Sequence, residues 1–136
     1  MPNKELPRPK GYEKLSLPKL VSKPWGWENW LELWYDSKTG RGYCLKLIFL
    51  KSNEKSSLQY HRKKVETQYV VKGRAEISLE DERGLIKKMI LSEGRFFTVI
   101  PGRRHRVTAL TDLTLLEVST PEIADIIRIK DDYDRK

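Results

Sequence analysis

Closely spaced turn-forming residues divide the chain into short segments, and this division restricts its fold more than any other feature. Clusters such as 36–40 and 80–84 combine Asp, Ser, Glu and Gly, which favour turns. The segments between turns have the length and alternation of β-strands, which we expect at residues 30–35, 43–50, 58–61, 67–79, 85–91, 96–100, 106–110 and 113–118. Strands of this length and spacing are typical of an all-β sandwich or closed barrel.

The two ends of the chain depart from this pattern. Residues 1–20 are poor in apolar side chains and contain Pro2, Pro7, Pro9 and Pro18, which interrupt regular elements. We therefore expect an N-terminal arm at residues 1–22 and a single domain at residues 23–136. Residues 121–129 are compatible with a short helix or with a strand.

The composition is that of an ordinary soluble domain. A length of 136 residues is enough for one apolar core without disulfide bonds, and the single cysteine, Cys44, cannot form one within the chain. No apolar run reaches the length of a membrane span, and the N-terminus lacks the apolar core of a signal peptide. These features predict a cytoplasmic protein that does not bind membranes.

The formal net charge of +8 raises the question of a nucleic-acid partner. The basic residues are, however, spread along the chain and mixed with acidic ones, and no nucleic-acid-binding motif accompanies them. The densest basic clusters flank the two histidines. We therefore expect an anionic small molecule rather than nucleic acid as the partner.

Both histidines of the chain occur beside other metal-binding side chains. Gln59 and His61 are two residues apart on an expected strand, so they point to the same face. Glu66 follows after a four-residue turn, where a hairpin can return its carboxylate to the imidazole. His105 follows the Pro-Gly turn at 101–102. These four residues are the candidate metal ligands.

The four side chains offer one amide oxygen, two imidazole nitrogens and one carboxylate. Such a mixed set suits one divalent ion of Zn, Mn, Fe, Ni or Co and leaves coordination positions open for water or a substrate. The alternative is that the two histidines are ordinary surface or core residues, since histidine is common at turns. Composition alone does not separate these interpretations.

The order and spacing of these residues resemble the two sequence motifs of the cupin superfamily. The first motif runs from Gln59 through His61 and Glu66 to Gly73, and Gln59 stands where the family has its first histidine. The second motif occupies residues 94–105 and ends on the second histidine. The resemblance implies an all-β cupin double-stranded β-helix, or jelly-roll barrel, with the metal ion inside it.

Four blocks of sequence also resemble, in order, the type II mannose-6-phosphate isomerase family. They are Lys-Pro-Trp-Gly at 23–26, Gly-Tyr-Cys-Leu-Lys at 42–46, Ser-Leu-Gln-Tyr-His at 57–61 and Asp-Ile-Ile-Arg-Ile-Lys-Asp-Asp-Tyr-Asp-Arg at 125–135. The resemblance does not include the guanylyltransferase domain to which this cupin domain is often fused. It implies metal-dependent interconversion of mannose 6-phosphate and fructose 6-phosphate.

This reaction needs a base beside a carbonyl group and cations for the phosphate. Glu66 is the candidate base as well as a metal ligand, and no other carboxylate is expected on the inner face of the strands. Lys46, which matches a lysine of the family, is the candidate catalytic and phosphate-binding cation. Gln68 shares the inward parity of Glu66 and is expected to contact the substrate. Arg103 and Arg106 flank the second histidine and complete the expected phosphate site, although strand parity directs Arg106 away from the metal.

Two other functions remain open at this point. One is a non-catalytic, metal-containing cupin that binds a sugar or sugar nucleotide. The other is a metal-dependent dioxygenase, against which Gln59 argues because oxygen activation usually relies on several nitrogen ligands. Small cupins often pair through their sheet edges, so we expect a homodimer.

Overall fold

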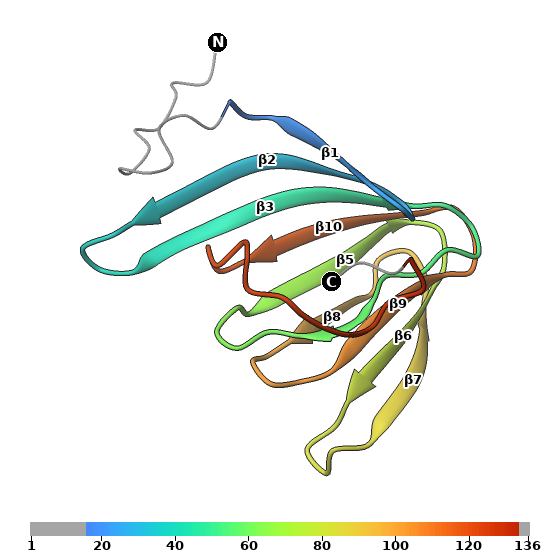
Figure 1. Cartoon of the computed structure of the whole chain (residues 1–136). Coiled ribbons are helices and arrows are strands. Elements are labelled where there is room, and N and C mark those ends of the chain that lie inside the picture. Colours follow the sequence, from blue (N-terminus) through green and yellow to red (C-terminus); the bar gives the residue numbers. More distant parts are fainter. Residues whose placement is uncertain (1–15, 134–136) are drawn as a thin grey trace.

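The structure, a computed structural model, describes residues 16–133. All regular elements in this part of the chain are strands: β1 (Lys19–Lys23), β2 (Gly26–Asp36), β3 (Arg41–Leu50), β4 (Leu58–Tyr60), β5 (Glu66–Lys72), β6 (Ala75–Glu80), β7 (Ile86–Leu91), β8 (Phe96–Val99), β9 (His105–Ala109), β10 (Leu113–Ser119) and β11 (Ile127–Lys130). They form two antiparallel sheets, with strand orders β1-β2-β3-β10-β5-β8 and β11-β4-β9-β6-β7 (Figure 1). The all-β expectation is therefore confirmed.

The two sheets face each other across a shared apolar core. Ile48, Val70 and Leu115 contribute to it from the six-stranded sheet, and Ile77 and Val107 contribute from the five-stranded sheet. All five are at most 5% exposed. Alternation explains this arrangement, because every second side chain of a strand points to the same face.

The inner face of the six-stranded sheet changes from apolar to polar along its strands. In β10, Leu113 and Leu115 are buried on this face, and the next two side chains of the same parity are Glu117 and Ser119, which are also buried. Strand register aligns the change, because Leu115 lies opposite Ile48 of β3, whereas Glu117 lies beside polar residues of both neighbouring strands. One end of this inner face therefore belongs to the apolar core, and the other end is polar.

A glycine divides the single strand that we expected at residues 67–79. β5 ends at Lys72 and β6 begins at Ala75, with Gly73 between them at a φ of +95°. A Cβ atom at Gly73 would collide with the carbonyl oxygen of Asp112. Both the conformation and the close approach require glycine at this turn.

The ends of the described chain also differ from the expected pattern. β1 pairs with β2 and spans the boundary that we placed between residues 22 and 23, whereas residues 1–15 of the expected arm lie outside the described residues. Residues 121–126 form no helix, and β11 follows them and pairs with β4. Within residues 16–133 no helix is long and apolar enough to span a membrane.

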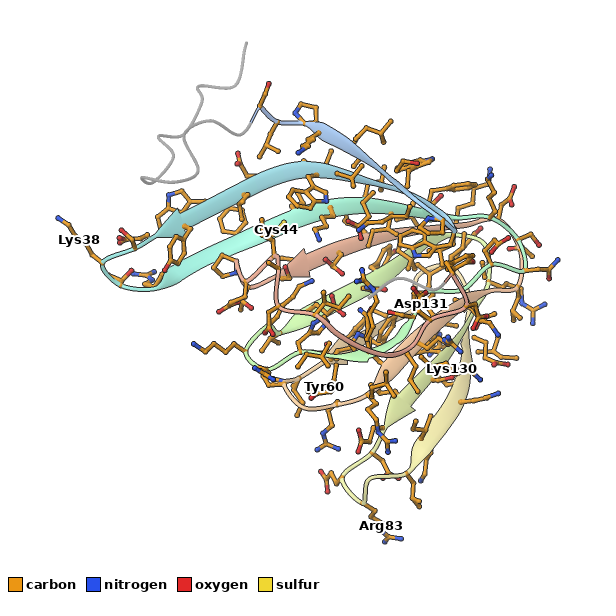
Figure 2. The ribbon with its side chains drawn as sticks, in the orientation of Figure 1. Lys38, Cys44, Tyr60, Arg83, Lys130 and Asp131 are labelled. Atoms are coloured by element: carbon orange, nitrogen blue, oxygen red, sulfur yellow. The ribbon has the colours of Figure 1, made fainter. Side chains whose placement is uncertain are left out.

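Several basic side chains lie far from the interior. Lys38 and Arg83 are exposed at the ends of the β2–β3 and β6–β7 hairpins, where they point away from both sheets (Figure 2). They account for part of the net charge without contributing to a site.

Candidate metal centre

Three of the four predicted metal ligands form one buried cluster. His61 follows β4, Glu66 begins β5 and His105 begins β9, and each side chain is about 2% exposed. The Glu66 Oε1 atom lies 3.3 Å from His61 Nε2 and 3.1 Å from His105 Nε2. One candidate ligand atom from each residue lies within 4.8 Å of the others. The fold therefore brings the two sequence motifs together.

Hydrogen bonds on the far side of each ring fix the orientation of the two histidines. His61 Nδ1 lies 2.5 Å from the carbonyl oxygen of Asp125, and His105 Nδ1 lies 3.0 Å from the carbonyl oxygen of Arg103. A carbonyl oxygen can only accept, so Nδ1 carries the proton in both rings. In the neutral rings each Nε2 therefore presents a lone pair to the Glu66 carboxylate.

This arrangement leaves two nitrogen lone pairs and a carboxylate oxygen facing one another. Three acceptors in contact repel unless a cation lies among them, either a proton on a ring or a metal ion. Metal-bound histidines commonly donate their second ring N–H to a carbonyl oxygen, as both rings do here. His61, Glu66 and His105 thus fit a divalent metal ion.

Gln59 borders this cluster from β4. Its Nε2 lies 3.4 Å from His105 Nε2, and its Oε1 accepts a hydrogen bond from Ser57 Oγ at 2.7 Å. Exchange of the two amide atoms turns Oε1 towards His105 and lets Nε2 donate to the Ser57 hydroxyl, which also accepts. Gln59 therefore fits the role of a fourth ligand in the exchanged orientation.

A cavity of about 120 Å³ opens beside the cluster and contains two further predicted site residues. Lys46 and Gln68 line it together with the candidate metal ligands. Arg103 and Arg106 are not part of its wall. Arg106 instead donates to the carbonyl oxygens of Ser56 at 2.8 Å and of Lys130 at 3.2 Å. The phosphate-binding role of the two arginines stays a prediction.

The expectation of a single inward carboxylate was wrong. Glu117, which is 3% exposed, and Glu28 both line the cavity. Glu117 has the same strand parity as Leu113 and Leu115, so a charged residue at the third inward position of an apolar strand was the signal in the sequence. The cavity wall therefore holds two carboxylates, Glu117 and Glu28, besides the one in the histidine cluster.

Buried ion pairs connect these carboxylates. The Lys64 ammonium lies 3.2 Å from Glu66 Oε2 and 3.5 Å from Glu117 Oε2. The Lys46 ammonium lies 3.7 Å from Glu117 Oε2 and 3.8 Å from Glu28 Oε2. A buried charge is tolerated only with such partners, so removal of one member leaves the others uncompensated.

The two central carboxyl groups have opposite pKa shifts. Burial raises the pKa of Glu117 to about 7, and the Glu66 carboxylate acts in the same direction. Burial also acts to raise the pKa of Glu66, but its hydrogen bonds with Glu117 and, when a ring carries a second proton on Nε2, with the histidines, together with the Lys64 ammonium, hold it well below its ordinary value. For Lys64 itself, burial acts to lower the pKa, but the two carboxylates outweigh it and raise the pKa.

Asp125 is a further site residue that the sequence pattern did not reveal. Besides the carbonyl oxygen that binds His61, its carboxylate accepts hydrogen bonds from the backbone N–H groups of residues 62–64 at 2.7–3.1 Å. Residues 62–64 lie in the turn between His61 and Glu66. Asp125 therefore contacts both a candidate ligand and the turn that connects two of them.

Comparisons with known proteins agree with this geometry. The family model described as the cupin domain matches residues 47–119. No curated protein sequence matches the chain.

Solved structures show the same fold at low sequence identity. A point mutant of Bacillus subtilis oxalate decarboxylase matches with a TM-score of 0.71 and 18% identity over 83% of this chain and 30% of that one. A further structure of that decarboxylase, described by its Mn(II) centres, matches with a TM-score of 0.67 and 17% identity over 82% of this chain and 30% of that one.

The capsular polysaccharide assembling protein CapF from Staphylococcus aureus matches with a TM-score of 0.68 and 16% identity over 83% of this chain and 34% of that one. The chain spans about a third of the length of these proteins. The expected jelly-roll fold is confirmed.

Proposed function

We propose that this chain, which belongs to the cupin family, is a metal-dependent isomerase of sugar phosphates. It would interconvert an aldose phosphate and a ketose phosphate, and mannose 6-phosphate and fructose 6-phosphate are the pair to test. His61, Glu66 and His105 would hold one divalent ion, and Gln59 would complete the set. The chemistry that such an ion supplies is the stabilisation of negative charge on a substrate oxygen. The Mn(II) centres of the related decarboxylase support Mn(II) as the first ion to test.

The observation that carries this proposal is the buried carboxylate of Glu117, which lies beside the candidate metal cluster without belonging to it. The reaction moves the hydrogen of C2 to C1 and the hydroxyl proton of O2 to O1, so it uses no oxidant or reductant. It needs a base that is not itself a metal ligand. Glu117 lines the same cavity as the cluster and shares the Lys64 ammonium with Glu66. In this proposal Glu117 removes the proton from C2 and returns it to C1.

Two neighbours orient Glu117 for this role. Gln68 Nε2 donates to its Oε1 at 2.9 Å, and Lys64 lies beside its Oε2. The carboxylate is therefore held in one orientation, and its pairing with Lys64 keeps it beside the candidate ligand Glu66. Positioning of this kind contributes much of the rate of a proton transfer.

A coupled assay for formation of fructose 6-phosphate from mannose 6-phosphate tests the proposal. We expect turnover by protein loaded with Mn(II), and a loss of about 100-fold or more in Glu117→Gln with unchanged metal content, because general base catalysis contributes about 10²–10⁴-fold. His105→Ala is expected to lose both metal and turnover. Elemental analysis of each preparation is the control.

Each of the open alternatives predicts a different result. Wild-type protein that holds a full equivalent of metal without turnover would contradict the isomerase. Sugar-phosphate binding without turnover would favour the non-catalytic module, and consumption of oxygen would favour the dioxygenase. A Glu117→Gln variant with full activity would exclude Glu117 as the base.

A further inference from the structure

A row of polar side chains crosses the inner face of the six-stranded sheet beside the metal cluster. Lys46 of β3 lies opposite Glu117 of β10, and Glu117 lies opposite Gln68 of β5. All three side chains are at most 7% exposed and line the cavity. Gln68 has the same parity as Glu66 and is two residues further along β5. The row therefore lies one inward position away from the metal cluster.

The polar atoms of this row are only partly satisfied within the described chain. Gln68 Oε1 is buried and has no hydrogen-bond partner among residues 16–133. Glu117 Oε2 is likewise buried without a hydrogen bond there, although the ammonium groups of Lys64 and Lys46 pair with it at 3.5 and 3.7 Å. The Lys46 ammonium faces carboxylate oxygens of Glu117 and Glu28 at 3.7 and 3.8 Å, which is too long for hydrogen bonds. Buried polar atoms of this kind are normally satisfied by water or by a ligand. The cavity thus presents both unused donors and unused acceptors.

The charges of the row identify the kind of ligand it can bind. The single positive charge of Lys46 lies between two carboxylates, and its ammonium also lies 4.9 Å above the ring of Trp30. The other two lysines of the cavity wall are paired as well, Lys23 with Glu28 and Lys64 with Glu66 and Glu117. A phosphate group placed here would therefore have to compete with these carboxylates for every lysine of the wall, and its unprotonated oxygens would leave Gln68 Oε1 without a donor. Hydroxyl groups carry no charge and both donate and accept. They can satisfy Lys46, Gln68 and Glu117 together.

We propose that Lys46, Glu117 and Gln68 form a subsite for the uncharged hydroxyl groups of a carbohydrate, and that Lys46 is a specificity residue for hydroxyls rather than a phosphate ligand. The inference rests on the proposed function in one respect, namely that the cavity takes a carbohydrate. The phosphate of a sugar phosphate then lies outside this row. Discrimination follows because a site built to hydrogen-bond hydroxyl groups rejects ligands that lack them.

Binding measurements with two uncharged probes and one anion test the subsite. Metal-loaded protein is titrated with D-mannose, D-fructose and inorganic phosphate, and dissociation constants are measured by NMR chemical-shift perturbation. We expect the wild-type protein to bind at least one of the two sugars. Lys46→Met and Gln68→Met should each weaken sugar binding about tenfold or more, because each loses a buried hydrogen bond. Lys46→Met should bind phosphate as the wild type does.

Thr67→Val is the matched control, because Thr67 precedes Gln68 on β5 and its hydroxyl makes an exposed hydrogen bond with Thr98 on the opposite face. This variant should bind the sugars unchanged. Circular dichroism checks that each variant folds. If Lys46→Met does not fold because Glu28 and Glu117 each lose one of their ion-pair partners, Gln68→Met provides the test, since it removes no charge.

Three results would overturn the subsite: no sugar binding by the wild type, equal sugar binding by Gln68→Met and the wild type, or loss of phosphate binding in Lys46→Met. The measurement does not depend on turnover. Sugar binding that depends on the row, in a protein without isomerase activity, would contradict only the proposed function. Turnover with unchanged sugar binding in Gln68→Met would contradict only the subsite.

Discussion

At the scale of single residues, the hydrogen bond behind each imidazole determines what the histidines can do. Because Asp125 and Arg103 accept the Nδ1 protons of His61 and His105, both Nε2 lone pairs point at Glu66. Glu66 stays ionised because its pKa is held low. The three side chains are thus prepared for a cation in the folded protein, and little reorientation is needed when it binds.

The contribution of Gln59 can be separated from that of the histidines. An amide oxygen is a weaker ligand than an imidazole, so Gln59→Ala should lower the affinity for Mn(II) by about tenfold, and His105→Ala by more than about 100-fold. Isothermal titration calorimetry of chelator-treated protein measures both. Equal losses in the two variants would show that Gln59 is a full ligand, and no loss in Gln59→Ala would show a three-ligand site.

At the scale of elements, the chain that follows β10 holds the site together. It leaves the six-stranded sheet and returns as β11 beside β4 in the other sheet (Figure 1). Asp125 fixes its first part to the turn at 62–64. Asp132 fixes its last part through ion pairs with Lys55 at 3.1 Å and Arg106 at 3.3 Å. Only the first of these attachments contacts a candidate metal ligand.

We therefore expect Asp125→Ala to lower the affinity for Mn(II) about 10–100-fold, because three backbone N–H groups lose their acceptor and the turn between His61 and Glu66 is released. Asp132→Ala is the matched control, since its ion pairs are partly exposed and should leave the affinity unchanged. The affinities are measured by calorimetry well below the unfolding temperature. If Asp125→Ala and Asp132→Ala lose equal Mn(II) affinity, the effect comes from docking of the whole segment after β10 and not from Asp125 alone.

At the scale of the whole molecule, many of the buried side chains in residues 16–133 are charged or polar: ten are, beside fifteen buried hydrophobic ones. Such groups stabilise a fold less than apolar packing does, and they stabilise it least when a partner is missing. A metal ion that binds only the folded state adds RT ln(1 + [ion]/Kd) to the free energy of unfolding, which is about 4 kcal/mol at 1,000 times Kd. The stability of this protein should thus depend strongly on its metal content.

Removal of metal by a chelator should accordingly lower the unfolding temperature by about 15 °C. Differential scanning calorimetry with and without chelator measures the shift. The unfolding temperature of His105→Ala should not respond to the chelator, which controls for effects of the chelator itself. If the chelator does not change the unfolding temperature of metal-loaded wild-type protein, the cluster is stable without a metal ion. The expected homodimer and cytoplasmic location stay predictions.

The sequence by itself determined most of the strands and the three residues of the candidate metal cluster. Alternation and turn residues are local signals, so they predicted most of the strands, and the spacing around His61, Glu66 and His105 placed these side chains at the ends of elements. Parity along a single strand also predicted that Gln68 points inwards. It equally directs Glu117 inwards, although the inward residues before it in β10 are leucines.

Only the tertiary structure decided which polar side chains meet. The row of Lys46, Glu117 and Gln68 depends on the register of three strands that are far apart in sequence, and register is fixed by packing rather than by local propensity. The contact of Asp125 with His61 joins residues 64 positions apart. Arg106 lies beside the second motif in sequence, yet its position on the opposite face of β9 lets it bind the C-terminal segment. Local patterns therefore specified the candidate ligands, and the folded arrangement specified their surroundings.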